Sequence, residues 1–226
     1  MEVGHVSFMV ARYYGRDRIM KRIILASASP RRKEILSRTG LRFRVEESGY
    51  DEDLKSAMRP RDLALFLSRQ KARSVADRRR NAIIIAADTF IVFKGKVLGK
   101  PHTDAEAMRM LTELNGRVHT VITGYTVMDT DTGKEISRYA ETKVYFRQLT
   151  REEIESYVDS GEPLDKAGGY AIQGLGAALV RKIEGDFYNV VGLPLNMLVE
   201  SLKKFGVNVC GKEATSRKPV RDTGTT

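Results

Sequence analysis

The hydrophobic run AIIIAA, residues 82–87, ends at a carboxylate, Asp88. It is the longest unbroken apolar stretch of the sequence, yet it is far shorter than the roughly 20 residues that a membrane-spanning helix needs. Its β-branched residues predict a buried strand of a soluble protein. A tight turn at Lys94 and Gly95 should lead from this strand into a returning one.

Strands and helices alternate along the chain, which predicts an α/β fold. The short strand RIILA, residues 22–26, precedes a helix with Ser29 at its N-cap and Pro30 at its first position. Thr150 and Glu153 form the capping box of another helix. Further helices are predicted in residues 59–77, 103–116, 151–161 and 193–206, and a long hairpin is predicted in residues 117–149.

Composition narrows the class of protein and its partners. The 226 residues, 42% of them hydrophobic, suffice for the core of one large or two-lobed domain. The formal net charge of +10 indicates polyanionic partners such as nucleotides or nucleic acid. The single cysteine, Cys210, excludes a disulfide within the chain and has no metal-ligand spacing around it, which favours a reducing cytoplasm.

The two ends of the chain differ from the segment between them. Residues 1–20 do not have the pattern of a signal peptide, and we expect them to form an extension before the domain in residues 21–209. Met20 directly precedes the first strand, so our hypothesis is that the ancestral chain began there. Residues 210–226 are polar and predict a disordered tail.

Two arginines, Arg31 and Arg32, occupy the first turn of the helix that Ser29 caps. Cations there are unfavourable by roughly 0.3–1 kcal/mol each, because the N-terminal end of the helix dipole is positive. A bound anion explains the arrangement, since Ser27, Ser29, backbone N–H groups and both guanidinium groups could donate to it. The alternative is a pair of solvated surface arginines. The strand–turn–helix setting favours a phosphate site.

Asp88 is the second candidate, because a carboxylate at the end of a buried strand is costly unless it is paired, bound to metal or used in chemistry. The turn returns Lys100 to the level of Asp88, although strict alternation puts their side chains on opposite faces. A structural ion pair is the alternative to a functional role. Glu52 could hold Mg²⁺ together with Asp88, unless it belongs only to a solvated acidic loop.

The glycine-rich segment PLDKAGGYAIQG, residues 163–174, is the third candidate. Its glycines permit close approach of a ligand, Lys166 adds positive charge, and Gln173 can donate and accept hydrogen bonds at a base edge. The alternative is an ordinary turn, since neither the dinucleotide-binding fingerprint nor the P-loop pattern is present. The histidines lack zinc spacing, and His119 is expected to be a satisfied structural residue.

Four segments in this order resemble the Maf family of nucleotide pyrophosphatases: LASASPRRKEIL, AADTFIVFKGKVLGKP, GRVHTVITG, and LDKAGGYAIQGLGAALV with YNVVGLPL. The match runs from about residue 21 to residue 206. The resemblance implies a two-lobed α/β fold of the Maf or ITPase-like type, with a long twisted mixed sheet flanked by helices and a cleft between the lobes. It also implies a homodimer that hydrolyses nucleoside triphosphates to the monophosphate and pyrophosphate with Mg²⁺ or Mn²⁺.

The chain resembles the branch of this family that acts on dTTP and UTP at two positions, Lys166 in DKAG and Gln173 in IQG. The branch acting on 7-methyl-GTP typically has Cys-Ala-Gly in place of Lys-Ala-Gly and lacks the glutamine. The resemblance therefore implies dTTP and UTP as the substrates.

The matching motifs imply a role for each residue. Asp88 becomes the general base and a metal ligand, and Glu52 becomes the second acid of the metal site. The implied phosphate-binding residues are Ser27, Ser29, Arg31, Arg32, Lys71 and Lys100, the implied specificity residues are Arg31, Thr89 and Gln173, and Lys166 is a further pocket residue.

Two other functions stay open at this point. One is a nucleic-acid-binding regulator of cell division without significant hydrolysis, and the other is a pyrophosphatase for a modified nucleotide. The sequence lacks basic strands interleaved with aromatic residues, which single-strand binders use, and it has the acids that hydrolysis needs. These observations favour the enzyme.

Overall fold

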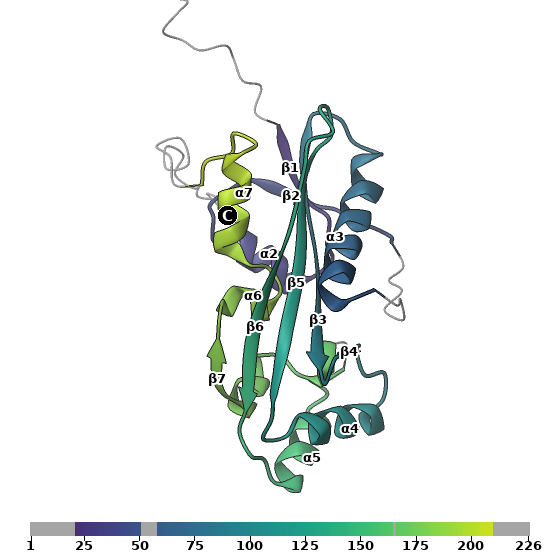
Figure 1. Cartoon of the computed structure of the whole chain (residues 1–226), viewed down its shortest axis with the longest axis vertical. Coiled ribbons are helices and arrows are strands. Elements are labelled where there is room, and N and C mark those ends of the chain that lie inside the picture. The colour runs from purple at the N-terminus through teal and green to yellow at the C-terminus, as the bar shows by residue number, and fades with distance from the viewer. Residues whose placement is uncertain (1–20, 51–57, 165, 210–226) are drawn as a thin grey trace, which may run out of the picture.

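The computed structural model describes residues 21–50, 58–164 and 166–209, and these form one seven-stranded mixed sheet flanked by helices (Figure 1). The strands are β1 (Arg22–Leu25), β2 (Phe43–Val45), β3 (Ala82–Phe93), β4 (Lys96–Leu98), β5 (Val118–Asp129), β6 (Glu135–Phe146) and β7 (Val180–Glu184). The helices are α2 (Pro30–Ser37), α3 (Pro60–Ala76), α4 (Asp104–Leu114), α5 (Arg151–Asp159), α6 (Phe187–Val191) and α7 (Leu195–Lys203), with 3₁₀ helices η1 (Ala167–Gly169) and η2 (Gly174–Leu179).

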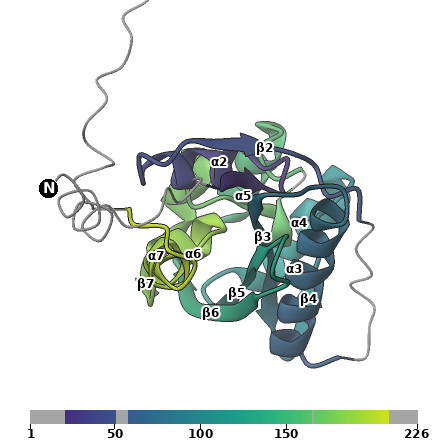
Figure 2. The same ribbon diagram turned by 90° about the horizontal axis from the view of Figure 1, so that it is seen from above.

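Three strands of 12 residues each, β3, β5 and β6, run the length of the molecule (Figure 1). The strand order is β2-β1-β3-β5-β6-β7, and β4 pairs with β3 outside this path. β1 pairs in parallel with both of its neighbours, and the other pairs are antiparallel. Figure 2 shows α3 on one side of the sheet and α6 and α7 on the other.

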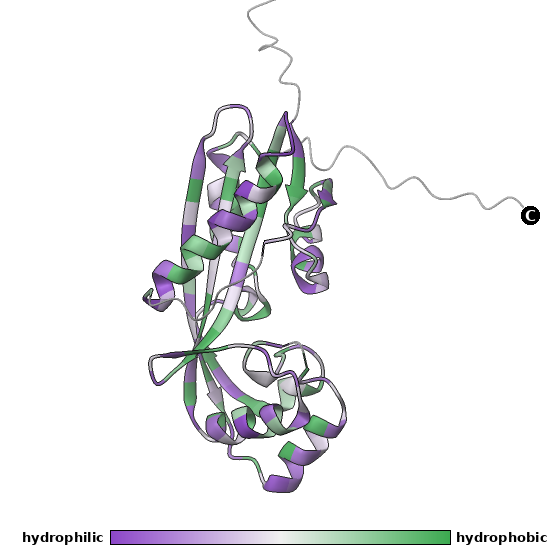
Figure 3. Ribbon diagram, turned by 90° about the vertical axis from the view of Figure 1, so that its right-hand side faces the viewer, coloured by the Kyte–Doolittle hydropathy of each residue, from purple (hydrophilic) through white to green (hydrophobic). Residues whose placement is uncertain are grey.

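The two lobes have separate hydrophobic cores at opposite ends of the long strands (Figure 3). In the first lobe, Ile83 and Ile85 of β3 pack with residues of α2 and α7. In the second lobe, Ile91 and Phe93 of the same strand pack with residues of α4 and α5. β3 therefore passes from one core into the other, and Asp88 lies between them.

Helix α3 packs very close to the sheet at Gly124 of β5. A Cβ atom at this position would lie 2.1 Å from the carbonyl oxygen of Ala64 in α3. Because no other residue type fits at that separation, glycine allows α3 to lie directly on β3 and β5. With α3 this close to the sheet, Lys71 in its second half reaches Asp88 in the middle of β3.

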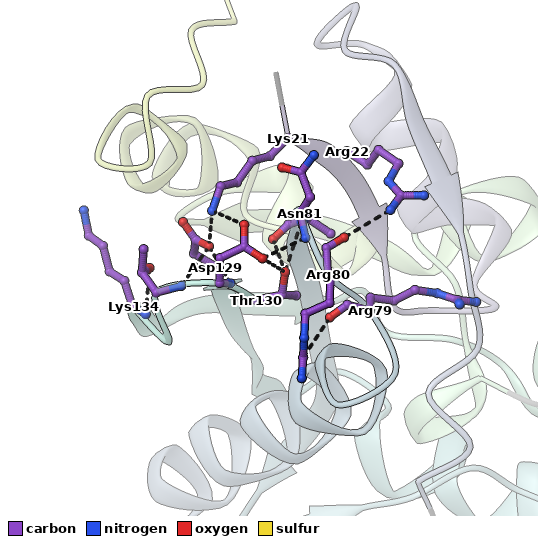
Figure 4. A network of polar contacts seen from close by, with 11 residues as sticks. Lys21, Arg22, Arg79, Arg80, Asn81, Asp129, Thr130 and Lys134 are labelled. Atoms are coloured by element: carbon purple, nitrogen blue, oxygen red, sulfur yellow. Dashed lines mark hydrogen bonds and ion pairs between the residues drawn. The ribbon is translucent and has the colours of Figure 1, made fainter. Parts of the chain in front are cut away.

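Lys21 connects the start of β1 to the tip of the β5–β6 hairpin (Figure 4). Its Nζ lies 2.5 Å from Asp129 Oδ1 and 2.8 Å from Asp131 Oδ2. The backbone N–H of Asn81, just before β3, donates to Asp131 Oδ1 at 2.8 Å. The hairpin tip is thus attached to the beginnings of both β1 and β3.

Several local predictions are confirmed, among them the turn at Lys94 and Gly95, the long hairpin, and the capping box of Thr150 and Glu153. Helix α6 and strand β2 were not predicted, since five and three residues are too few to show a period. No helix of the described residues is long and apolar enough to span a membrane. The expected extension and tail, with Cys210, lie outside the described residues, so the domain boundaries stay predictions.

His119 in β5 is buried in the second lobe, as expected for a structural residue, but only one of its ring nitrogens is hydrogen-bonded. Nε2 lies 2.7 Å from the hydroxyl of Tyr170, and the ring meets Phe146 edge-on at 5.0 Å. Nδ1 has no hydrogen-bond partner among the described residues. Burial lowers the pKa of His119 from 6.5 to about 4, so the folded protein holds this histidine neutral.

This shift predicts a pH dependence of stability. Between pH 6.5 and about 4, the unfolded chain binds a proton at His119 that the folded chain does not bind. The free energy of unfolding should therefore fall as the pH falls through this window, by at most about 3 kcal/mol. The variant His119→Gln keeps a hydrogen-bonding group but does not titrate. When the free energy of unfolding in urea is plotted against pH between pH 7 and pH 5, the slope should be smaller for His119→Gln than for the wild type.

The matched control is His102→Gln, since His102 is exposed. This variant should keep the wild-type slope. Equal slopes for wild type and His119→Gln would show that His119 does not carry the effect.

Candidate active site

The N-terminus of α2 is built from the turn after β1. Ser29 is the N-cap, its side chain accepts a hydrogen bond from the backbone N–H of Arg32, and Pro30 holds the first helical position. Ser27 Oγ accepts the backbone N–H of Ser29 at 3.3 Å. The first turn contains no acidic residue to offset the positive end of the helix dipole, so an external anion is favourable there.

Arg32 links three segments of the protein. Its Nε donates to the carbonyl of Gly192 at 2.9 Å, Nη1 to Ser27 Oγ at 3.2 Å, and Nη2 to Thr89 Oγ1 at 3.0 Å. Thr89 Oγ1 lies 2.9 Å from Thr123 Oγ1, so the link continues into β5. Arg32 thus fixes the start of α2 against β3 and the end of α6.

Arg31 has a different environment from its neighbour. It is half-buried and makes no hydrogen bond to a described residue. Burial lowers the pKa of Arg31, and the charge of Glu162 offsets part of this effect. A guanidinium group stays charged in proteins, so Arg31 offers its donors to a ligand. The sequence predicted that both arginines bind an anion together. In the structure they differ, because Arg32 is hydrogen-bonded to the protein and Arg31, among the described residues, is not.

Asp88 lies in β3 with 4% of its surface exposed, and its ion-pair partner is Lys71 of α3, with 7% exposed. Both charges are thus nearly removed from water. In such a buried position an unpaired charge would be costly. The sequence suggested Lys100 as the neighbouring cation. Lys100 lies two residues beyond the end of β4, so strand alternation does not fix its direction, and it is exposed.

The glycine-rich segment docks against the exit of β4. The N–H of Gly168 donates to the carbonyl of Gly99 at 2.8 Å, and Lys166 Nζ donates to the carbonyl of Leu164 at 3.2 Å. Gln173 is the N-cap residue of η2, is half-buried, and makes no cap hydrogen bond with its side chain. Lys166 and Gln173 of this segment line the same cavity as Lys100, which follows β4.

Residues of both lobes line one cavity of about 750 Å³. It contains every described candidate from the sequence: Ser27, Ser29, Arg31, Arg32, Lys71, Asp88, Thr89, Lys100, Lys166 and Gln173. Glu52 lies outside the described residues. The cations among the lining residues outnumber the described carboxylates, which are Glu47 and Asp88, so the cavity suits an anion.

The sequence reasoning missed other residues of the cavity wall, including Glu47, Tyr170 and Gly192. Gly192 contributes a backbone carbonyl, which no side-chain pattern reveals. Glu47 lies on the turn after β2 and has no local motif. Among the described residues, no group of three or more histidine, cysteine, aspartate or glutamate side chains could hold a metal ion by itself.

Comparison with known proteins places this architecture in a family. The family model described as Maf-like protein matches residues 22–205. The chain is 51% identical over 191 residues to the dTTP/UTP pyrophosphatase of Methanosarcina barkeri, covering 84% of this chain and 97% of that protein. It is 50% identical over 193 residues to the dTTP/UTP pyrophosphatase of Moorella thermoacetica, covering 85% of this chain and 100% of that protein.

The chain is also 45% identical over 190 residues to the dTTP/UTP pyrophosphatase of Bacillus cereus, covering 84% of this chain and 93% of that protein. Among solved structures, the Ham1 protein of Staphylococcus aureus aligns with a TM-score of 0.43 and 14% identity, over 71% of this chain and 80% of that one. This structural likeness is too low to support any conclusion.

The geometry of α2 predicts that Arg31 contributes directly to anion binding. Inorganic tripolyphosphate, titrated by calorimetry, should bind Arg31→Gln at least ~10-fold more weakly than the wild type, because a hydrogen bond to a charged group contributes about 1.5–3 kcal/mol. The control is Lys33→Gln, which removes the same charge from an exposed position of the same helix. Equal losses in both variants would point to net charge alone.

Proposed function

Because this chain belongs to the family of Maf-like proteins, we propose that it hydrolyses dTTP and UTP to the monophosphate and pyrophosphate. The observation that carries the proposal is one cavity in which the buried carboxylate of Asp88 lies among lysine and arginine side chains. A triphosphate needs such cations, and the attack of water on its α-phosphorus needs a proton acceptor.

The phosphate chain is assigned to the groups with hydrogen-bond donors directed at the cavity. These are the backbone N–H and the guanidinium of Arg31, at the start of α2, and the ammonium of Lys100. Charge-assisted hydrogen bonds of this kind are about twice as strong as neutral ones. Arg32 supports them by holding Ser27 and Thr89 in place.

Asp88 is assigned the role of general base. Its carboxylate orients a water molecule and accepts the proton that the water loses as it attacks the α-phosphorus, and pyrophosphate leaves from the opposite side. Lys71 holds the carboxylate through the buried ion pair, so little motion is needed to reach the reactive geometry.

A divalent cation fits the described donors as a partner of the substrate. Mg²⁺ and Mn²⁺ prefer carboxylate oxygens, water and phosphate oxygens, and Glu47 and Asp88 bring two carboxylates to the cavity wall. We propose Asp88 as a metal ligand, with Glu52 as the second acid. When bound, the ion would neutralise charge on the triphosphate.

The assembly and location follow as further proposals. We infer a homodimer in the cytoplasm from the family resemblance and from the single cysteine. A modified pyrimidine nucleotide would use the same cavity, so a panel of canonical and modified triphosphates decides the preferred substrate.

The role of Asp88 predicts a loss of turnover. Asp88→Asn, assayed well below its melting temperature, should lower kcat for pyrophosphate release from UTP by ~10²–10⁴-fold, the usual contribution of a general base. Its melting temperature should also fall, because the buried ion pair with Lys71 is lost. Asp77→Asn, at the exposed end of α3, is the control and should keep wild-type kcat. Near-normal turnover of Asp88→Asn would remove Asp88 from the reaction.

The position of Gln173 predicts a change in base preference. Gln173→Ala should reduce the ratio of kcat/KM for UTP over CTP by ~10-fold or more, because a hydrogen bond to the base edge is lost. The exposed Gln148 lies outside the cavity wall, and Gln148→Ala should leave the ratio unchanged. A uniform loss for all nucleotides would argue against base recognition by Gln173.

A further inference from the structure

One carboxylate, Glu162, anchors the loop that follows Gln173. Its Oε2 accepts the backbone N–H of Leu175 at 2.9 Å, and its Oε1 accepts the N–H of Gly176 at 2.8 Å. Burial raises the pKa of the Glu162 carboxyl, but these two N–H donors, together with the Tyr157 hydroxyl and the charge of Lys166, hold the pKa below its usual range. The charged form therefore binds the loop.

The segment before Gln173 is anchored through the same carboxylate. Tyr157, on the last turn of α5, donates its hydroxyl to Glu162 Oε1 at 3.0 Å. The same hydroxyl accepts the backbone N–H of Ala171 at 3.3 Å. Gln173 thus lies between two anchored points of the chain, and neither Glu162 nor Tyr157 is part of the cavity wall.

The anchored loop has little room to change shape. A Cβ at Gly176 would lie 2.2 Å from the carbonyl oxygen of Ala171 and 2.7 Å from the Tyr157 hydroxyl. At Gly174, where φ is +82°, a Cβ would lie 2.6 Å from Glu162 Oε2. Residues 171–176 therefore fold tightly around the Tyr157–Glu162 pair, and the backbone of Gln173 is set by it.

We infer that Glu162 is a positioning residue for recognition of the nucleotide base, acting through Gln173 without touching the substrate. The inference rests on the proposed function, in which the cavity binds a pyrimidine nucleoside triphosphate. Glu162 is also the carboxylate whose charge acts on Arg31, so it connects two residues assigned to specificity.

Substitution of Glu162 should weaken recognition of the nucleotide base much more than binding of the phosphates. An amide that reads a base edge must be placed within about 0.5 Å of its productive position. The groups assigned to the phosphates lie on other elements, at the start of α2 and after β4. Loosening the loop around Gln173 therefore leaves their geometry unchanged.

The experiment compares Glu162→Gln with the wild type in calorimetric titrations of non-hydrolysable α,β-imido analogues of UTP and CTP and of inorganic tripolyphosphate. Glu162→Gln should lower the UTP-over-CTP affinity ratio by ~10-fold without weakening the binding of tripolyphosphate, because loss of the negative charge that acts on Arg31 favours an anion. Tyr157→Phe removes only the bridging hydroxyl and should lower the ratio in the same direction. Glu155→Gln is the matched control, since Glu155 lies on α5 and pairs with the exposed Arg151.

A double variant separates positioning from general stability. If Glu162 acts through Gln173, adding Glu162→Gln to Gln173→Ala should cause no further loss of base preference, because interacting sites are not additive. An unchanged ratio in Glu162→Gln, additive losses in the double variant, or equal losses for nucleotides and tripolyphosphate would each overturn the inference.

The experiments distinguish failure of the proposed hydrolysis from failure of the inference about Glu162. Wild-type protein that binds UTP selectively but releases no pyrophosphate would refute hydrolysis, and the affinity ratios would still decide the role of Glu162. Wild-type protein that binds the two nucleotides equally would overturn the inference about Glu162 whatever its catalytic activity.

Discussion

The cavity depends on a gap in the pairing along one edge of β3. β1 pairs with this edge as far as Ile85, and β4 pairs with it from Ile91 onward. No described strand covers the edge between these two residues. The other edge is paired with β5 without interruption from Ile83 to Val92, so β3 stays continuous across the gap. A site can therefore open in the middle of the sheet without breaking the strand that carries Asp88.

The gap also explains how neighbouring residues of one strand meet cations from different helices. Because side chains alternate along a strand, Asp88 faces α3 and pairs with Lys71, whereas Thr89 faces α2 and accepts from Arg32. Each polar group is held by a cation that is itself anchored in the fold. Buried charge is tolerated here because it is paired, whereas Arg31 makes no hydrogen bond to a described residue.

Much of the fold and of the candidate site was predictable because the signals are local. Ser29 and Pro30 mark the start of α2, Thr150 and Glu153 mark the start of α5, and the run before Asp88 marks the central strand. The pairing of Asp88 with Lys71 was not predictable from spacing, since it depends on how closely α3 approaches the sheet at Gly124. The bond from Arg32 to the carbonyl of Gly192 joins residues 160 positions apart, and no local pattern encodes it.

The sequence alone determined the α/β class, the chemistry of the candidate residues and their likeness to one family, because caps, turns and motifs involve residues that are close in the chain. Tertiary structure decided which cation pairs with Asp88, which of the two arginines is hydrogen-bonded to the framework, and how Glu162 holds the loop of Gln173. These contacts form only when two lobes pack around three shared strands, and packing distances between distant segments are not written in the spacing of residues along the chain.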